Sequence, residues 1–178
     1  MAKGMYHYIR EAWKKPSPEI LKARMTEWRR SLAITRVEKP LRLDKARALG
    51  YKAKPGFVVV RVRLLRGGRK RPARRSGRRS KRQTIHKTLM MNYRWVAEQR
   101  AARKFPNLEL LNSYWLGKDG MHYFYEAILV DPQHPQIRAD PSINWICSPK
   151  NRGRAFRGLT SAGKKARGLR AKGKKAQF

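Results

Sequence analysis

The sequence predicts an α+β fold, in which helices pack on a small mixed sheet. Three patterns carry this prediction: apolar residues at helical spacing near the N-terminus, a β-branched run at 57–65, and two apolar runs at 108–116 and 121–130 that flank a Gly-Lys-Asp-Gly turn. The predicted order of helices, a strand, a helix and a hairpin suggests an α+β arrangement.

Two helices are expected before residue 40. Residues 5–15 place apolar side chains, among them Tyr8 and Trp13, on one face of a short helix. The second helix begins at Ser17-Pro18-Glu19, since Ser can cap the helix, Pro suits its first position and Glu complements its positive end. Apolar residues then recur at helical spacing, and Pro40 closes the unit.

A short helix at 44–49, capped by Asp44, precedes the first strand. Within the run FVVVRVRLL at 57–65, Val60, Val62 and Leu64 share one face. Arg61 and Arg63 therefore point to the opposite face. We expect a strand with one face in the core and the other presenting arginines.

The rest of the chain alternates basic and foldable segments. The tract at 66–83 has no apolar side chain larger than Ala73 and contains Gly and Pro, which is typical of an extended loop. A helix is expected at 84–104, followed by the hairpin. Asp140-Pro141 predicts a further helical start.

A chain of 178 residues is about one domain long. We expect a single globular domain over 1–149, which contains the basic loop at 66–83, and a basic C-terminal extension over 150–178. The extension has few sizeable apolar residues, so we expect it to need a partner to offset the entropy of ordering.

The charge is unevenly distributed. The net charge is +34, yet no acidic residue lies between Asp44 and Glu98 or after Asp140. These two stretches contain 29 of the 45 Lys and Arg residues. A partner with a dense array of negative charge follows, and nucleic-acid phosphate is the expected source.

Several classes of function are disfavoured. The single cysteine, Cys147, excludes an intrachain disulfide and a cysteine-based zinc site. The four histidines lack paired metal-ligand spacing, and we expect no metal, no cofactor, no small-molecule substrate and no catalysis. No apolar run approaches the roughly 20 residues that span a bilayer, so no membrane partner is expected.

RNA fits this pattern better than DNA, because Arg/Gly loops read shape and phosphate positions, and the chain lacks zinc-finger or basic-zipper spacing. A DNA-compacting protein and an RNA-modifying or RNA-cleaving enzyme remain alternatives. Tyr6, Tyr51 and Phe156, which lie among basic residues, are candidates for base stacking. Arg supplies the bidentate fork that suits phosphate.

Four blocks of sequence carry a resemblance to a known family: GYKAKPGFVVVRVRLLRGGRKRP at 50–72, LNSYWLGKDG at 111–120, YEAILVDPQHPQIR at 125–138 and RGLTSAGKKARGL at 157–169. In this order they closely resemble the archaeal and eukaryotic large-subunit ribosomal protein called fifteen-e. The resemblance covers nearly the whole chain and implies a compact α+β body with RNA-threading extensions.

The resemblance further implies a structural, cytoplasmic constituent of the large ribosomal subunit, whose partners are large-subunit rRNA and neighbouring large-subunit ribosomal proteins. Candidate RNA-binding residues carried over by motif are Tyr51, Lys52, Lys54, Arg61, Arg63, Arg66, Gly67, Gly68, Arg69, Lys70, Arg71, Arg157, Thr160, Ser161, Lys164, Lys165 and Arg167. Charge adds Arg74, Arg75, Arg78 and Arg79. Thr160 and Ser161 are expected to cap a short helix that approaches a phosphate.

The sequence departs from the family at 73–87, which is unusually rich in Arg, and after residue 169, where eukaryotic members continue further. Both departures favour an archaeal member. The RNA contacts assigned within these two segments rest on charge alone.

Overall fold

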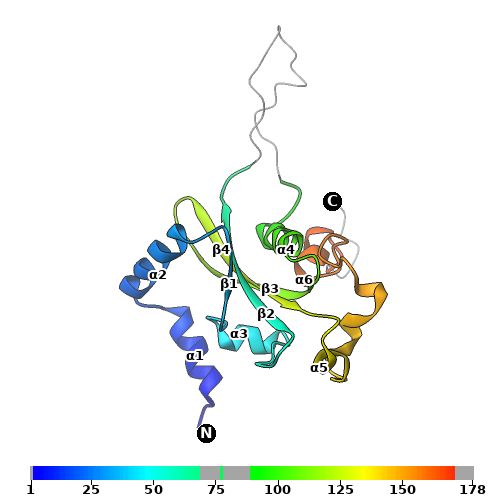
Figure 1. Cartoon of the computed structure of the whole chain (residues 1–178). Helices are drawn as coiled ribbons and strands as arrows, with labels where there is room; N and C mark the ends of the chain where they lie inside the picture. The colour runs from blue at the N-terminus through cyan, green and yellow to red at the C-terminus, as the bar shows by residue number, and fades with distance from the viewer. Residues whose placement is uncertain (1, 69–76, 78–88, 171–178) are drawn as a thin grey trace.

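A computed structural model of the chain describes residues 2–68, 77 and 89–170. At its centre lies one four-stranded sheet in the order β1-β2-β4-β3 (Figure 1). The strands are β1 Ile34–Val37, β2 Phe57–Leu65, β3 Glu109–Lys118 and β4 His122–Val130. The helices are α1 Met5–Lys14, α2 Pro18–Arg30, α3 Leu43–Ala48, α4 Tyr93–Lys104, α5 Pro135–Arg138 and α6 Ser161–Ala166, with the 3-10 turns η2 Asn144–Cys147 and η3 Pro149–Asn151.

The predicted α+β class is confirmed, but the sheet is not mixed. All three strand pairings are antiparallel, and the central strand β4 pairs with both β2 and β3. The predicted hairpin forms β3 and β4, and the Asp119 carboxylate accepts backbone hydrogen bonds from Met121 and His122 at its turn. Every pair of neighbouring strands runs in opposite directions, so the sheet contains no parallel pair.

Both faces of the sheet are covered (Figure 1). On one face, Trp28 of α2 and Ala46 of α3 pack against Phe124 and Ile128 of β4. On the other face, α4 packs through small residues, Ala97 and Ala101, against Val60, Val62, Leu110 and Leu129. Alanines four residues apart on one helix face allow that helix to approach the sheet closely.

One strand and one helix boundary differ from the prediction. Strand β1 was not expected, because its four residues fall between the second helix and Pro40 and are too short to show alternation. Helix α4 begins at Tyr93, with Asn92 as its cap, and residues 89–92 are not helical. The earlier part of the helix predicted from residue 84 lies outside the described residues.

The first part of the predicted extension packs on the body. Ala155 is 1% exposed and joins the core between α4 and the sheet, and Ala162 of α6 is also buried. Residues 150–170 therefore bury apolar surface without a partner, through small side chains that the sequence analysis discounted. The division at residue 149 stays a prediction.

Candidate nucleic-acid interface

The predicted basic loop leaves the body at the end of β2, where Gly67 is clamped to α4. The Gly67 N–H donates to the Tyr93 hydroxyl at 2.8 Å, and that hydroxyl donates to the Gly67 carbonyl at 2.6 Å. Gly67 has a φ of +105°, which a residue with a Cβ adopts only with strain. Of the predicted loop residues, Arg69, Lys70, Arg71, Arg74, Arg75, Arg78 and Arg79 lie outside the described residues.

Arg66, at the base of this loop, contacts the β3–β4 turn. Its guanidinium donates to the Asp119 carbonyl at 2.7 Å and lies 5.0 Å from the centre of the Tyr123 ring. These contacts fix the direction in which the chain leaves β2.

Arg61 and Arg63 point away from the valines of β2, as predicted, but that face is not free. Helix α2 covers it, so that the Arg61 guanidinium lies 5.4 Å from the Trp28 ring centre and 3.7 Å from the Glu27 carboxylate. Arg63 donates to the Arg29 carbonyl at the end of α2. Burial lowers the pKa of Arg61, which Glu27 and Glu126 partly offset. The expectation that this sheet face is uncovered is wrong, because α2 packs on it; contact of Arg61 and Arg63 with RNA stays a prediction.

A second acid, Glu126, lies on the same face of the sheet as Arg61 and binds the backbone at Leu41. Glu126 lies opposite Arg61 in the β2–β4 register and is 1% exposed. Its carboxylate accepts hydrogen bonds from the Tyr114 hydroxyl and from the Leu41 backbone N–H. Burial raises the pKa of Glu126, and the hydrogen bonds and nearby arginines act against that shift.

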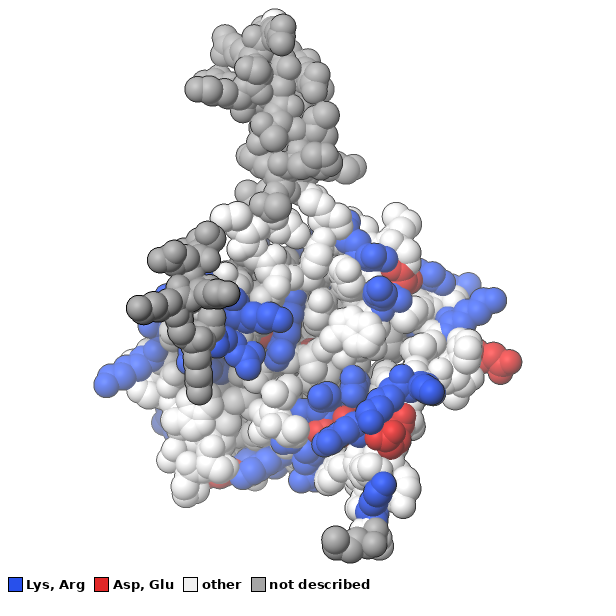
Figure 2. Space-filling model, turned by 180° about the vertical axis from the view of Figure 1, so that it is seen from behind, with Lys and Arg blue, Asp and Glu red and all other residues white. Residues whose placement is uncertain are grey.

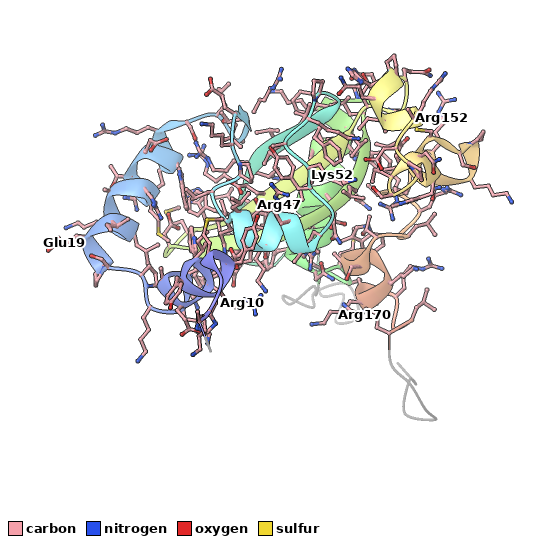
Figure 3. All side chains as sticks on the ribbon, turned by 90° about the horizontal axis from the view of Figure 1, so that it is seen from below. Arg10, Glu19, Arg47, Lys52, Arg152 and Arg170 are labelled. Atoms are coloured by element: carbon pink, nitrogen blue, oxygen red, sulfur yellow. The ribbon has the colours of Figure 1, made fainter. Side chains whose placement is uncertain are left out.

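Lys52 and Lys54 are bound to one carboxylate. Their ammonium groups lie 2.7 Å and 2.5 Å from the same Asp140 oxygen, and Lys52 also contacts the Ser142 hydroxyl at 2.6 Å. The hydrogen bonds from the two lysines hold the pKa of Asp140 well below its usual range. Figure 3 shows Lys52 near Arg47 of α3. One of the two positive charges of this pair is therefore compensated by Asp140 within the protein.

The predicted stacking residues fall into two classes. Tyr51 is 8% exposed and meets Phe57 edge to face at 5.7 Å, so its ring is part of the core and not a platform for bases. Tyr6 and Phe156 are exposed. Three further exposed rings were not predicted as stacking candidates: Tyr8 on α1, Trp115 on β3 and Trp145 on η2. The Arg154 guanidinium lies 4.9 Å from the centre of the Trp145 ring.

Thr160 does not face solvent. It is 1% exposed, and its hydroxyl donates to Glu98, a residue of α4 with no exposed surface. It also accepts from the Gly163 N–H at 3.1 Å, so it caps α6 as predicted, but from inside the protein. The Thr160 side chain therefore points into the protein and not toward solvent.

Glu98 joins three segments of the chain. The carboxylate accepts from Ser113 of β3 and from Thr160, and lies 3.9 Å from the Arg94 Nε atom. Burial raises the pKa of Glu98, while the two hydroxyl donors and the charges of Arg94 and Arg154 oppose that shift. Arg94 in turn donates to Ser113 Oγ at 2.8 Å and to Asn112. The fold of the C-terminal segment therefore depends on an acid in α4.

Two glycines bring the backbone of α6 against the preceding turn. A Cβ added at Gly163 would lie 2.6 Å from the Gly158 Cα atom. Gly158 itself has a φ of +66°, and a Cβ there would lie 2.7 Å from the Arg167 Cδ atom. Atoms at these distances clash, so the Gly-Leu-Thr-Ser-Ala-Gly motif is a packing requirement.

The cations of α6 and its flanks differ in their partners. Arg157 and Arg167 donate to backbone carbonyls, of Lys150 and of Arg157 respectively. Ser161 accepts from Arg170 at 3.1 Å. Lys164 and Lys165 are exposed, and their side chains make no hydrogen bond or ion pair with any described residue. Their full charge is available to a partner.

The two acid-free stretches meet at the start of α4. Asn92 donates from its side-chain amide to the Ala162 carbonyl of α6 at 2.8 Å, and the next residue, Tyr93, clamps Gly67 at the base of the loop. Trp95 adds a third link, from its indole N–H to the Ala155 carbonyl at 2.6 Å. Figure 1 shows α4 and α6 side by side, near the point where the loop leaves the sheet.

Basic side chains spread over the back of the molecule, with acids at only a few positions (Figure 2). Within the described ranges, no group of three or more His, Cys, Asp and Glu residues has a geometry suited to a metal ion. In the same ranges, no helix is both long and apolar enough to cross a bilayer.

A comparison with known protein families places this basic α+β chain among the ribosomal proteins. The sequence matches the family described as Ribosomal L15, of the L15e type, over residues 4–178, and the chain belongs to that family. It is thus a structural, non-enzymatic type of protein and a constituent of the large subunit of the cytoplasmic ribosome. The family predicted from the four sequence blocks is confirmed.

Proposed function

We propose that the chain binds and stabilises folded large-subunit rRNA through two basic elements, the loop at 66–83 and the C-terminal segment from residue 150. Neighbouring large-subunit proteins are the expected secondary partners, and no catalytic step is assigned to any residue. The observation that carries the proposal is the junction at the start of α4, where Asn92 contacts α6 and Tyr93 contacts the base of the loop.

This junction gives the two elements a common rigid origin. Anchored ends lower the entropy that a charged segment loses when it binds, so more of the phosphate interaction appears as affinity. The free ammonium groups of Lys164 and Lys165 and the Arg-rich loop sequence supply the cations. Each phosphate that they neutralise releases counterions, which makes binding strongly dependent on salt.

The proposal assigns a structural role to four of the predicted RNA-binding residues, Arg61, Arg63, Lys52 and Lys54. Their partners lie within the protein, so they contribute mainly to the fold. We remove Tyr51 and Thr160 from the proposed interface, since both side chains are buried.

The proposal is tested by replacing residues 69–82 with a short Gly-Ser linker, which keeps the Gly67 clamp. Binding to large-subunit rRNA at roughly 0.15 M salt should weaken by about a hundredfold or more, because many phosphate contacts are lost together. The unfolding midpoint should stay unchanged. The matched control keeps the length and composition of the segment but shuffles its order. Normal co-sedimentation of the linker variant with large subunits after a high-salt wash would contradict the proposal.

A further inference from the structure

A pocket lies on the side of the body formed by η2, η3 and the start of β3. Its volume is about 380 Å³, and its walls include Pro106, Pro132, Pro149, Glu109, Arg138 and Arg152. This is within the range of roughly 300–1,000 Å³ that small-ligand sites occupy. None of the predicted RNA-binding residues lines it.

One wall of the pocket carries a carboxylate with an open position. Glu109 Oε1 accepts from the Gly153 N–H at 2.9 Å, and this bond holds the side chain in place. The second carboxylate oxygen has no hydrogen-bond partner among the described residues. A fixed acceptor of this kind suits an N–H donor on a ligand.

The two arginines of the pocket differ in whether their side chains have hydrogen-bond partners. Arg138 is held by the Pro132 carbonyl, 3.1 Å from its Nε atom, and by the Gln133 side chain, so it forms part of the wall. Arg152 is exposed, and its side chain has no hydrogen-bond or ion-pair partner among the described residues. Figure 3 shows Arg152 far from α1 and α2. An available guanidinium at the rim suits a phosphate.

We infer that this pocket receives a single nucleotide of the large-subunit rRNA, turned out of its stack, whose base carries an exocyclic amino group. The base enters between the prolines, its amino group donates to the free Glu109 oxygen, and its phosphate contacts Arg152. The inference rests on the proposed function, to which it adds a site for one base.

Three physical arguments favour a nucleotide. Folded RNA exposes unpaired bases that proteins bind by stacking and by hydrogen bonds to the base edge. The flat apolar surfaces of three prolines suit a planar base. A carboxylate would repel a phosphate backbone laid across it, but it accepts well from the amino group of cytosine, adenine or guanine. Uracil has no exocyclic amino group, and its N3–H lies between two carbonyl oxygens that a carboxylate repels, so it suits Glu109 less well.

The experiment uses large ribosomal subunits that contain the full chain with a photo-crosslinking phenylalanine derivative in place of Asn107, a pocket residue. Irradiation should join this position to one nucleotide of the rRNA, which reverse transcription identifies as A, C or G. Ala139, exposed and outside the pocket wall, is the matched control and should not crosslink to that nucleotide.

A second variant tests the role assigned to the carboxylate. Glu109→Gln retains an oxygen that accepts from Gly153 but replaces the free acceptor with a donor, so the thermal unfolding midpoint should not change. The crosslink yield from position 107 should fall by roughly tenfold, as expected for loss of a hydrogen bond to a charged group. An unchanged yield would overturn the inference.

The same probe placed at Lys164 separates this inference from the proposed function. A crosslink from position 164 to rRNA, together with a crosslink from position 107 to a protein, to a uridine or to nothing, overturns the pocket inference and leaves the proposed function standing. No rRNA crosslink from either position contradicts both.

Discussion

Two pairs of lysines in this chain carry the same charge but differ in whether an acidic side chain lies beside them. Lys52 and Lys54, which precede β2, share the Asp140 carboxylate at 2.7 Å and 2.5 Å. Lys164 and Lys165, on α6, have no such partner among the described residues. The difference shows that the number of cations does not set the charge available to RNA, because the few acids of the chain compensate particular ones.

The same contrast separates the two sides of the sheet. On the side of α2, Arg61 and Arg63 are occupied by Glu27, Trp28 and the end of the helix. On the side of α4, the buried Glu98 binds the Thr160 hydroxyl and so holds α6 in place, while the lysines of α6 remain free. On the α2 side Glu27 lies beside Arg61, whereas on the α4 side Glu98 lies beside Arg94 and also positions α6 through Thr160.

Among single substitutions, Gly163→Val is expected to have the largest effect on stability and on rRNA affinity. The new side chain would clash with the Gly158 backbone, displace α6 and destabilise the fold by about 2–3 kcal/mol, in the range of overpacking. Affinity for large-subunit rRNA should fall although no charge has changed. Urea unfolding and filter binding measure the two effects. Gly120→Val, at a glycine with open space around it, is the control.

Arg61→Met should instead weaken the fold and spare binding. The variant loses the cation–π contact with Trp28 and the interaction with Glu27, at a cost of about 1–2 kcal/mol in the free energy of unfolding. Its rRNA affinity should stay within about twofold of the wild type, since the proposed contacts lie elsewhere. A large loss of affinity with unchanged stability would place Arg61 at the RNA.

The pH dependence of stability should reveal Glu98. Because burial raises its pKa in the folded state above the ordinary value of 4.5, its stabilising contribution is complete below about pH 4.5 and is lost as the pH rises through the folded pKa. Wild type should therefore lose stability relative to Glu98→Gln between pH 4 and 8, by about 1.4 kcal/mol for each unit of pKa shift. Urea unfolding across this range, with Glu19→Gln as the exposed control, tests it; parallel curves would contradict it.

A smaller effect is expected from Asp140→Asn, which releases Lys52 and Lys54. With their carboxylate removed, the two ammonium groups become available to phosphate, and rRNA affinity should rise by about two- to fivefold at low salt. Filter binding at matched ionic strength measures the change. Asp131→Asn is the matched control, and equal gains from both would mean that only net charge matters.

The elements with local signals were predictable from the sequence. The helix start at Ser17-Pro18-Glu19, the alternation in β2 and the Gly-Lys-Asp-Gly turn each depend on a few adjacent residues. The sheet was predicted as mixed because strand pairing depends on contacts between distant segments, and β1 was too short to recognise.

The candidate site was less accessible to such reasoning. Lys52 and Asp140 are 88 residues apart in the chain, and so no local pattern shows that they meet. Thr160 has lysines and arginines nearby in the sequence, which predicts an exposed side chain. Its hydroxyl instead donates to the buried Glu98, 62 residues earlier in the chain. Tyr51 has basic neighbours in sequence but apolar neighbours in space. The junction at Asn92 and Tyr93 likewise has no signal in the sequence.

The central claim is that cations without an acidic partner carry the RNA binding, and a comparison of two double variants tests it most directly. Lys164→Ala with Lys165→Ala and Lys52→Ala with Lys54→Ala remove the same charge, and the affinity of each for large-subunit rRNA is measured as a function of salt. The account predicts that the slope of log affinity against log salt falls in magnitude by about 1.4–1.8 for the α6 pair, as for two lost phosphate contacts, and hardly changes for the other. Equal changes in slope for the two variants would contradict it.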